Sequence, residues 1–285
     1  MNFLFSAINP IAFSLGPLEV HWYGVIIASA IFVALFLSTR EAKKRGIEGD
    51  HIIDMALWAL PIAFIGARLY YVIFKLDYYL QNPGEIIAIW NGGIAIYGGL
   101  IAGGLTIYWY TKKHGIPIWL MLDVLVPNVL LAQAIGRWGN FINQEAHGGE
   151  VTRSFLENLY LPDFIINQMN INGTYYQPTF LYESLWSLVG FIVIVLVRNR
   201  KSLLRRGEVA LLYVLWYSLG RFFIEGLRTD SLMLVDWLRV SQALSVVLFI
   251  GALIIWILRR RDYPPVPYYL DGLSAKEEKE LTRLT

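Results

Sequence analysis

The chain lacks cysteine entirely and carries few charged residues for its length. Its 285 residues include no Cys, and only 16% are charged. The absence of Cys excludes disulfides, thiolate metal sites and a cysteine nucleophile supplied by the protein itself. The His residues show no HxxxH or HExxH spacing, so neither a metal site nor another cofactor is predicted. They lie at His21, His51, His114 and His147.

Apolar residues, in contrast, make up 56% of the chain, and the mean hydropathy is +0.49. Seven segments approach the roughly 20 residues needed to cross hydrocarbon. They cover 20–39, 52–74, 93–111, 118–136, 179–197, 208–227 and 240–258. Since lipid offers the backbone no hydrogen-bond partners, each should be a helix. We therefore predict an all-α integral membrane protein with about seven transmembrane helices. The fourth is the least regular, because polar residues and a proline interrupt it.

Basic residues are concentrated in alternate connections. Four Lys or Arg follow the first predicted span, two the third, five the fifth and six the seventh. The other connections hold only Lys75, Arg153, Arg228 and Arg239 clearly outside the spans, while Arg137 lies at the end of the fourth. The positive-inside rule then predicts an outer N-terminus and a cytoplasmic C-terminus. With few soluble segments, no nucleic-acid partner is predicted.

One connection is much longer than the others. Residues 137–178, between the fourth and fifth spans, should form an outer loop, and loops of this length are usually functional or disordered. No internal repeat or linker divides the chain, so residues 1–262 should form one polytopic domain. Residues 263–285 begin with three prolines among five residues and end in charges, which is typical of a solvated, cytoplasmic tail.

Several ionisable residues lie inside the predicted spans or at their rims, where charges are costly and usually functional. They are Arg68, Arg137, Glu183, Arg221, Glu225 and Arg228. The predicted topology places all of them toward the outer side. One interpretation is a set of ion pairs that fixes helix packing. The other is an anion site, because arginine forks match phosphate and carboxylates can orient the arginines. The two are compatible.

The densest polar segment is Gly136–Gly148, with the sequence GRWGNFINQEAHG. Arg137 supplies charge for a phosphate, and Asn140 and Asn143 supply neutral donors. Glu145 can tether an arginine or accept a proton. A polar helix end with its cap is the alternative interpretation.

This segment closely resembles the signature of the prolipoprotein diacylglyceryl transferase family, approximately G-R-x-G-N-F-x-N-x-E-x-x-G. Four shorter blocks resemble other motifs of the family in the same order. They are His21–Gly24 (HWYG), Gly66–Tyr70 (GARLY), Gln177–Glu183 (QPTFLYE) and Gly220–Arg228 (GRFFIEGLR). The resemblance therefore covers nearly the whole chain.

The resemblance implies a multi-pass enzyme of the bacterial cell membrane with its site toward the outer face. Its substrates would be the membrane lipid phosphatidylglycerol and prolipoprotein signal peptides carrying a lipobox cysteine. The diacylglyceryl group would pass to the cysteine thiol, forming a thioether and releasing glycerol phosphate. The implied catalytic residues are Arg137, Arg221, Glu145 and Glu225, and Tyr97 is added as a catalytic candidate by its position. The implied substrate-binding residues are Tyr23, Arg68, Asn140, Asn143, Gly148 and Arg228.

Two departures from the family pattern leave the proton acceptor open. Tyr97 stands where family members often carry a His before the Gly-Gly of the third span, and Gln177 replaces the His of a His-Pro pair. Tyr97 is the first candidate by position, although a phenol with a pKa near ~10 is a poor base. His21 and His147 lie on the predicted outer side, but an exposed loop His is more often incidental.

Three alternatives to this function stay open. An anion transporter would use the same arginines, although transporters usually show paired repeats, and none is visible here. A membrane scaffold or receptor would not need a costly polar cluster. A non-catalytic relative would keep the fold and lose activity through a substitution such as the one at Tyr97.

Overall fold

The computed structural model of the protein describes residues 7–16, 18–229, 233–235, 238–262, 264–274, 277 and 279. The chain divides into two compact units, and we describe each by itself. The first unit is drawn from Met1–Leu37 and Leu122–Leu270, and the second from Ser38–Met121 and Asp271–Thr285.

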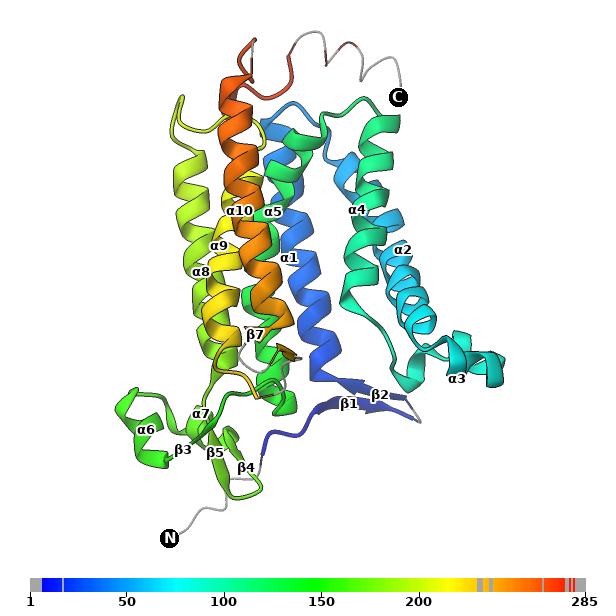
Figure 1. The fold of residues 1–285 in the computed structure, drawn as a ribbon, viewed down its shortest axis with the longest axis vertical. Coiled ribbons are helices and arrows are strands. Elements are labelled where there is room, and N and C mark those ends of the chain that lie inside the picture. Colours follow the sequence, from blue (N-terminus) through cyan, green and yellow to red (C-terminus); the bar gives the residue numbers. More distant parts are fainter. Residues whose placement is uncertain are drawn as a thin grey trace. The chain divides into compact units, whose positions relative to one another are not determined.

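Long helices form at all seven predicted positions, which confirms a mostly helical protein (Figure 1). They are α1 (Trp22–Lys44), α2 (Asp50–Phe74), α4 (Ile96–Lys113), α5 (Ile118–Asn143), α8 (Thr179–Arg198), α9 (Glu208–Glu225) and α10 (Val240–Arg261). Of these, α1, α2, α5, α8 and α10 are long and apolar enough to cross a membrane. Helices α4 and α9 have 18 residues each, and α9 carries Glu208, Arg221 and Glu225. Five candidate spans are thus established, and seven crossings stay a prediction.

In the first unit, α9 packs between α8 and α10 (Figure 1). The polar residues of the predicted fourth span have partners there. Asp123, fully buried, accepts the backbone N–H groups of Gly207 at 2.6 Å and Ala210 at 2.8 Å. The amide of Gln133 donates to the Tyr213 hydroxyl at 3.1 Å. Because the first N–H groups of a helix lack partners within it, Asp123 fixes the start of α9.

The connection between α5 and α8 is ordered and begins later than predicted. Helix α5 continues to Asn143, so the predicted start at 137 is corrected to 144. The connection contains β3 (Glu150–Val151), α6 (Arg153–Asn158), α7 (Asp163–Gln168), β4 (Asn170–Ile171) and β5 (Thr174–Tyr176). The strands form an antiparallel sheet in the order β3-β5-β4.

A small apolar core holds this connection onto the ends of α5 and α8. Its buried members are Phe141, Leu156, Ile165, Ile166, Met169 and Phe180. The side-chain amide of Gln168 donates to the carbonyls of Phe141 and Ile142, both at 3.1 Å. Since the last carbonyls of a helix lack partners within it, Gln168 stabilises the end of α5.

Two antiparallel hairpins complete the first unit: β1 (Ile11–Leu15) with β2 (Leu18–His21), and β6 (Met233–Val235) with β7 (Leu238–Arg239). Beyond α10, Tyr269 in η3 (Tyr269–Asp271) is fully buried and donates its N–H to the Leu204 carbonyl at 2.9 Å. Tyr269 is thus packed rather than solvated, while the assignment of residues 263–285 as a cytoplasmic polar tail stays a prediction. Positions 263, 275, 276, 278 and 280–285 of that tail lie outside the described residues.

In the second unit, α2 packs against α4, and Gly66 meets Gly98 at their closest approach. A Cβ on either glycine would collide with the backbone carbonyl of the other. Between these helices lie α3 (Leu76–Gln81), η1 (Pro83–Ile87) and η2 (Ile89–Asn91). Near the other end of the pair, Nδ1 of His51 lies 3.0 Å from the Tyr110 hydroxyl, and the His114 ring packs beside both.

Candidate functional site

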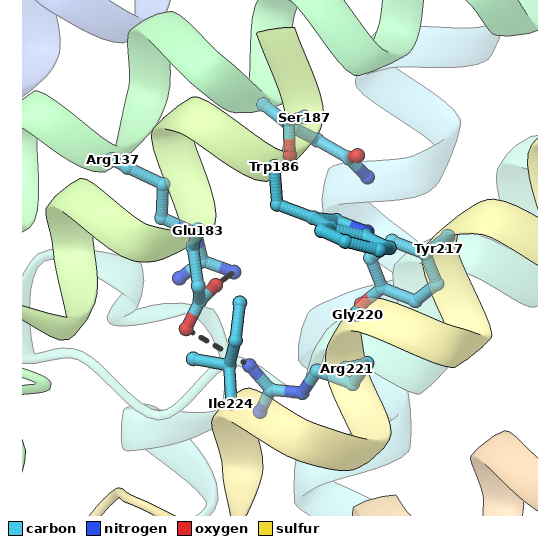
Figure 2. Close-up of a pocket in the computed structure, with 9 residues that line it drawn as sticks. Arg137, Glu183, Trp186, Ser187, Tyr217, Gly220, Arg221 and Ile224 are labelled. Carbon is cyan, nitrogen blue, oxygen red and sulfur yellow. Dashed lines mark hydrogen bonds and ion pairs between the residues drawn. The ribbon is translucent and has the colours of Figure 1, made fainter. Parts of the chain in front are cut away.

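Three arginines of the first unit converge on the carboxylate of Glu183, near the start of α8. Oε2 of Glu183 pairs with Nη2 of Arg137, near the end of α5. Oε1 lies 3.4 Å from Nη1 of Arg221 in α9 and 3.6 Å from Nη1 of Arg228, just beyond α9. Figure 2 shows Arg137 and Arg221 reaching the carboxylate from two sides. We call Glu183 with these arginines the arginine cluster.

A second carboxylate extends the arginine cluster along α9. Oε2 of Glu225 pairs with Nη2 of Arg221, one helical turn away. Arg239, at the start of α10, donates to the backbone carbonyls of Glu225 and, at 2.9 Å, of Arg228. Glu225 is only 2% exposed, and a buried carboxylate of this kind is stable only when paired. Arg239 thus fixes the backbone that carries two cluster residues.

A small pocket opens beside the arginine cluster. Its walls are Gln133, Arg137, Glu183, Trp186, Ser187, Tyr217, Gly220, Arg221 and Ile224 (Figure 2). Its volume is about 20 Å³, which suits about one water molecule. Oε1 of Gln133 is buried and has no hydrogen-bond partner among the described residues. The pocket is therefore polar and, with the ion pairs formed, too small for a lipid head group.

The amides of the signature segment gather around Glu145. Oε1 of Glu145 accepts from Nδ2 of Asn140 at 2.9 Å and from Nδ2 of Asn143 at 3.5 Å. Oδ1 of Asn140 in turn accepts from Nη1 of Arg137 at 3.5 Å. A polar chain thus leads from Glu145 through Asn140 to the arginine cluster. Such a chain orients the two amides, since each directs an N–H group at the Glu145 carboxylate.

The backbone around Glu145 is held in an unusual conformation. Gln144 and Ala146 have φ angles of 53° and 55°, in the left-handed region that non-glycine residues rarely adopt. This double turn folds the chain back from α5, so the Glu145 carboxylate faces the helix it has just left. Strain of this kind persists only where the surroundings enforce it, and it is often found at functional sites.

Gly148 lies where three chain segments meet. Its N–H donates to the Gln177 carbonyl at 3.0 Å, and its backbone forms a bridge with Arg228. A Cβ here would lie 2.7 Å from Cβ of Gln177 and 3.1 Å from the Leu227 carbonyl oxygen. Only glycine lets the signature segment approach the ends of α8 and α9 so closely.

Tyr23, in the first turn of α1, packs against Gly139 of the signature segment. A Cβ on Gly139 would lie 2.7 Å from the Tyr23 ring, so glycine is required for this contact. Tyr23 is 38% exposed. Its ring therefore covers the backbone between Arg137 and Asn140 without being enclosed.

A reciprocal contact between two tryptophans aligns α8 with α9 behind the pocket. The rings of Trp186 and Trp216 stack at 4.6 Å, and each indole N–H donates to the other residue's carbonyl, at 3.0 and 2.9 Å. Each ring lies over a glycine of the opposite helix, Gly220 or Gly190. Glu183 lies one turn before Trp186, and Arg221 follows Gly220. The contact therefore sets the register between the carboxylate and its arginine.

Two predicted site residues belong to the second unit. Arg68, only 6% exposed, donates all five N–H groups to backbone carbonyls of the loop between α3 and α4. The acceptors are Glu85, Ile86, Ala88, Gly92 and Gly93, at 2.6–3.4 Å. Tyr97, in the first turn of α4 just after this loop, is 38% exposed. Binding of substrate by Arg68 stays a prediction, and the geometry favours a role in shaping the loop.

Comparison with known proteins gives the family. The model of the prolipoprotein diacylglyceryl transferase family matches residues 10–258. The chain belongs to this family. It is 57% identical to the phosphatidylglycerol–prolipoprotein diacylglyceryl transferase of Lactiplantibacillus plantarum over 276 residues, 97% of this chain and 98% of the relative. It is 58% identical to the protein of that name from Bacillus velezensis over 260 residues, 91% and 95% of the two chains.

Most of the predicted site residues of this diacylglyceryl transferase family member lie in the first unit. The structure brings together eight of the predicted residues in the first unit: Arg137, Asn140, Asn143, Glu145, Gly148, Arg221, Glu225 and Arg228. The assignment of individual roles to these residues stays a prediction. Within the described part of the chain, no three His, Asp or Glu side chains gather as metal ligands would.

Glu183 is the central residue of the arginine cluster but is not among the predicted catalytic or substrate-binding residues. In the sequence it is a costly charge near a span and the end of a family block. Its three arginine partners lie 38 to 46 residues away along the chain, so spacing could not show the convergence. The available signal was its carboxylate at the rim of a predicted span, where a charge needs a partner of opposite sign.

Proposed function

We propose that this chain transfers the diacylglyceryl group of phosphatidylglycerol to the thiol of the lipobox cysteine of prolipoproteins. The products are a thioether-linked lipid and glycerol phosphate, and the reaction is the first step of lipoprotein maturation. The observation that carries this proposal is the convergence of Arg137 and Arg221, each from a family motif, beside one pocket. The names of the relatives give the same reaction.

The proposed setting is the bacterial cell membrane, crossed seven times, with the site toward the outer face. The five apolar helices and the family support a membrane protein. The excess of Lys and Arg in alternate connections supports an outer N-terminus and a cytoplasmic C-terminus. In this topology, residues 1–262 form one polytopic domain and residues 263–285 a cytoplasmic tail.

The reaction needs stabilisation of a departing phosphate. The cysteine thiolate of the prolipoprotein attacks the glycerol carbon that carries the phosphate ester, a carbon–sulfur bond forms and the carbon–oxygen bond breaks. The bonding electrons pass to the ester oxygen, which leaves on glycerol phosphate. Arg137 and Arg221 would bind the phosphate and stabilise this charge, since fixed donors act most strongly where charge develops. Arg228 would contribute a third guanidinium.

The remaining residues would position these groups. Asn140 and Asn143 would hold the glycerol head group, and Glu145 would orient the two amides, which it contacts at 2.9 and 3.5 Å. Glu225 would orient Arg221. Gly148 would allow the close approach of the chain segments.

Tyr23 and Arg68 would contribute to substrate binding. Tyr97 would accept the proton of the substrate thiol. The nucleophile belongs to the substrate, which explains how a protein without Cys performs thiol chemistry.

The decisive experiment combines purified protein, labelled phosphatidylglycerol and a peptide with a lipobox cysteine, beside an Arg137→Ala variant. Labelled thioether from the wild type that disappears in the variant is the expected result. No product from folded wild-type protein, with an active relative run in parallel, would refute transfer and indicate a non-catalytic member of the family.

A further inference from the structure

Glu183 engages the same guanidinium groups that the proposed reaction assigns to the lipid phosphate. Its two oxygens engage the guanidinium groups of Arg137, Arg221 and Arg228. Carboxylate and phosphate bind guanidinium through the same paired N–H···O geometry. The donors proposed for the substrate are therefore already engaged by an anion of the protein itself.

The available space leads to the same conclusion. The pocket beside Arg137 and Arg221 offers about 20 Å³, enough for about one water molecule but not for a phosphodiester with its glycerol. Some group must move before the head group enters. The Trp186–Trp216 contact holds α8 and α9 in register, so a side-chain movement is the smaller change. Glu183, on a flexible side chain, is the cluster anion that faces the pocket.

The charges support an exchange of anions. The site gathers four guanidinium groups and three carboxylates, which leaves one excess positive charge. They belong to Arg137, Arg221, Arg228 and Arg239, and to Glu145, Glu183 and Glu225. With Glu183 in place, the arginines are largely neutralised. When Glu183 withdraws, they can bind the phosphodiester, and when it returns, it competes with the glycerol phosphate that must leave.

We propose that Glu183 is an exchangeable internal anion of the arginine cluster. It pairs with the arginines at rest, gives way to the phosphate of phosphatidylglycerol and returns to displace glycerol phosphate. This inference rests on the proposed transfer reaction. Glu183 would then weaken phosphate binding and promote product release. A carboxylate that only oriented the arginines would instead strengthen phosphate binding.

The test compares Glu183→Gln and Glu183→Asp with wild type and with Glu157→Gln, which removes an exposed carboxylate in α6. Transfer is measured in micelles with a varied fraction of phosphatidylglycerol, and glycerol 1-phosphate is added as inhibitor. If Glu183 occupies the site for nine-tenths of the time, its removal should tighten phosphate binding about tenfold. We expect Glu183→Gln to lower both KM and the inhibition constant about tenfold, and to lower kcat because release slows.

Glu183→Asp, with a shorter reach to the arginines, should lower the inhibition constant less, and Glu157→Gln should leave it unchanged. A raised or unchanged inhibition constant in folded Glu183→Gln, with active wild type, would overturn the inference. If Glu183→Gln loses its thermal unfolding transition, the Asp variant decides, and an unchanged or raised constant there also overturns it. Absence of thioether product from the wild type would instead refute the proposed function.

Discussion

Arg137 and Arg68 are both arginines near the ends of long helices, yet their partners differ in kind. Arg137 pairs with the carboxylate of Glu183, which also contacts two other arginines. Arg68 donates to five backbone carbonyls of one loop. A carboxylate can be exchanged for another anion, whereas a set of carbonyls on a folded loop cannot. Buried arginine alone therefore does not identify an anion site, and the nature of the acceptor does.

The largest effect should follow from Arg137→Ala, which removes a guanidinium that pairs with a carboxylate rather than with loop carbonyls. We expect transfer to fall about 10³-fold, because a fixed donor to the leaving group is lost. Arg137→Lys should retain only part of the transfer activity, since an ammonium group lacks the planar fork of a guanidinium. Thioether formation is the measurement, with the exposed Arg153→Ala in α6 as control. More than a tenth of wild-type activity in Arg137→Ala would contradict the assignment.

Tyr97→Phe tests whether the loop shaped by Arg68 also carries chemistry. If the phenol accepts the thiol proton, kcat should fall about 100-fold, as is usual when a general base is lost. Tyr97→His should retain more activity than Tyr97→Phe, because imidazole titrates near neutral pH. The comparison uses initial rates at saturating lipid and peptide. A fully active Phe variant would remove Tyr97 from proton transfer.

Arg68→Lys should affect stability more than phosphate binding. Lysine cannot replace five directed N–H donors, so we expect the free energy of unfolding to fall by about 2 kcal/mol. The inhibition constant for glycerol 1-phosphate should change less than about twofold, since the loop and not the anion is the partner. Denaturant unfolding in detergent gives the first quantity and transfer assays the second. A tenfold weaker inhibition by glycerol 1-phosphate would place Arg68 among the phosphate ligands.

The smallest effect is expected from Gly190→Ala, which acts on the arginine cluster indirectly, through the contact between α8 and α9. The added methyl would collide with the Trp216 ring, at a cost of about 1 kcal/mol, and shift α8 against α9. Transfer activity should fall a few-fold because of this shift. Gly251→Ala in α10, where no atom lies within 4 Å of the added Cβ, is the matched control. Equal melting temperatures for the two variants would show that the tryptophan contact tolerates adjustment.

The long helices were predictable because apolar length is a local property. Even α5, interrupted by Asp123 and Pro127, forms where the sequence placed it. Its true end was missed because the polar residues after Gly136 are typical of a loop, whereas Gln168, 25 residues beyond the helix end, supports the last turn. The strands between α5 and α8 span only two or three residues, too few for an alternating pattern.

The candidate site was predictable as a set of residue types but not as a set of contacts. The family block GRFFIEGLR contains Arg221, Glu225 and Arg228; in the structure Arg221 pairs with Glu225, and Arg228 lies just beyond the end of α9. The central role of Glu183 and the carbonyl partners of Arg68 depend on how distant segments fold together. Neither follows from periodicity, because each contact joins residues with no regular separation.

The contact between Asp123 and the start of α9 has a mechanical consequence. Asp123 accepts two backbone N–H groups at the start of this helix, and Arg239 donates to the carbonyl of its last residue, Glu225, and to that of Arg228 just beyond it. Side chains from outside α9 therefore hold its start and the chain just beyond its end, which opposes fraying of the helix at its start and displacement of the segment that carries Arg228.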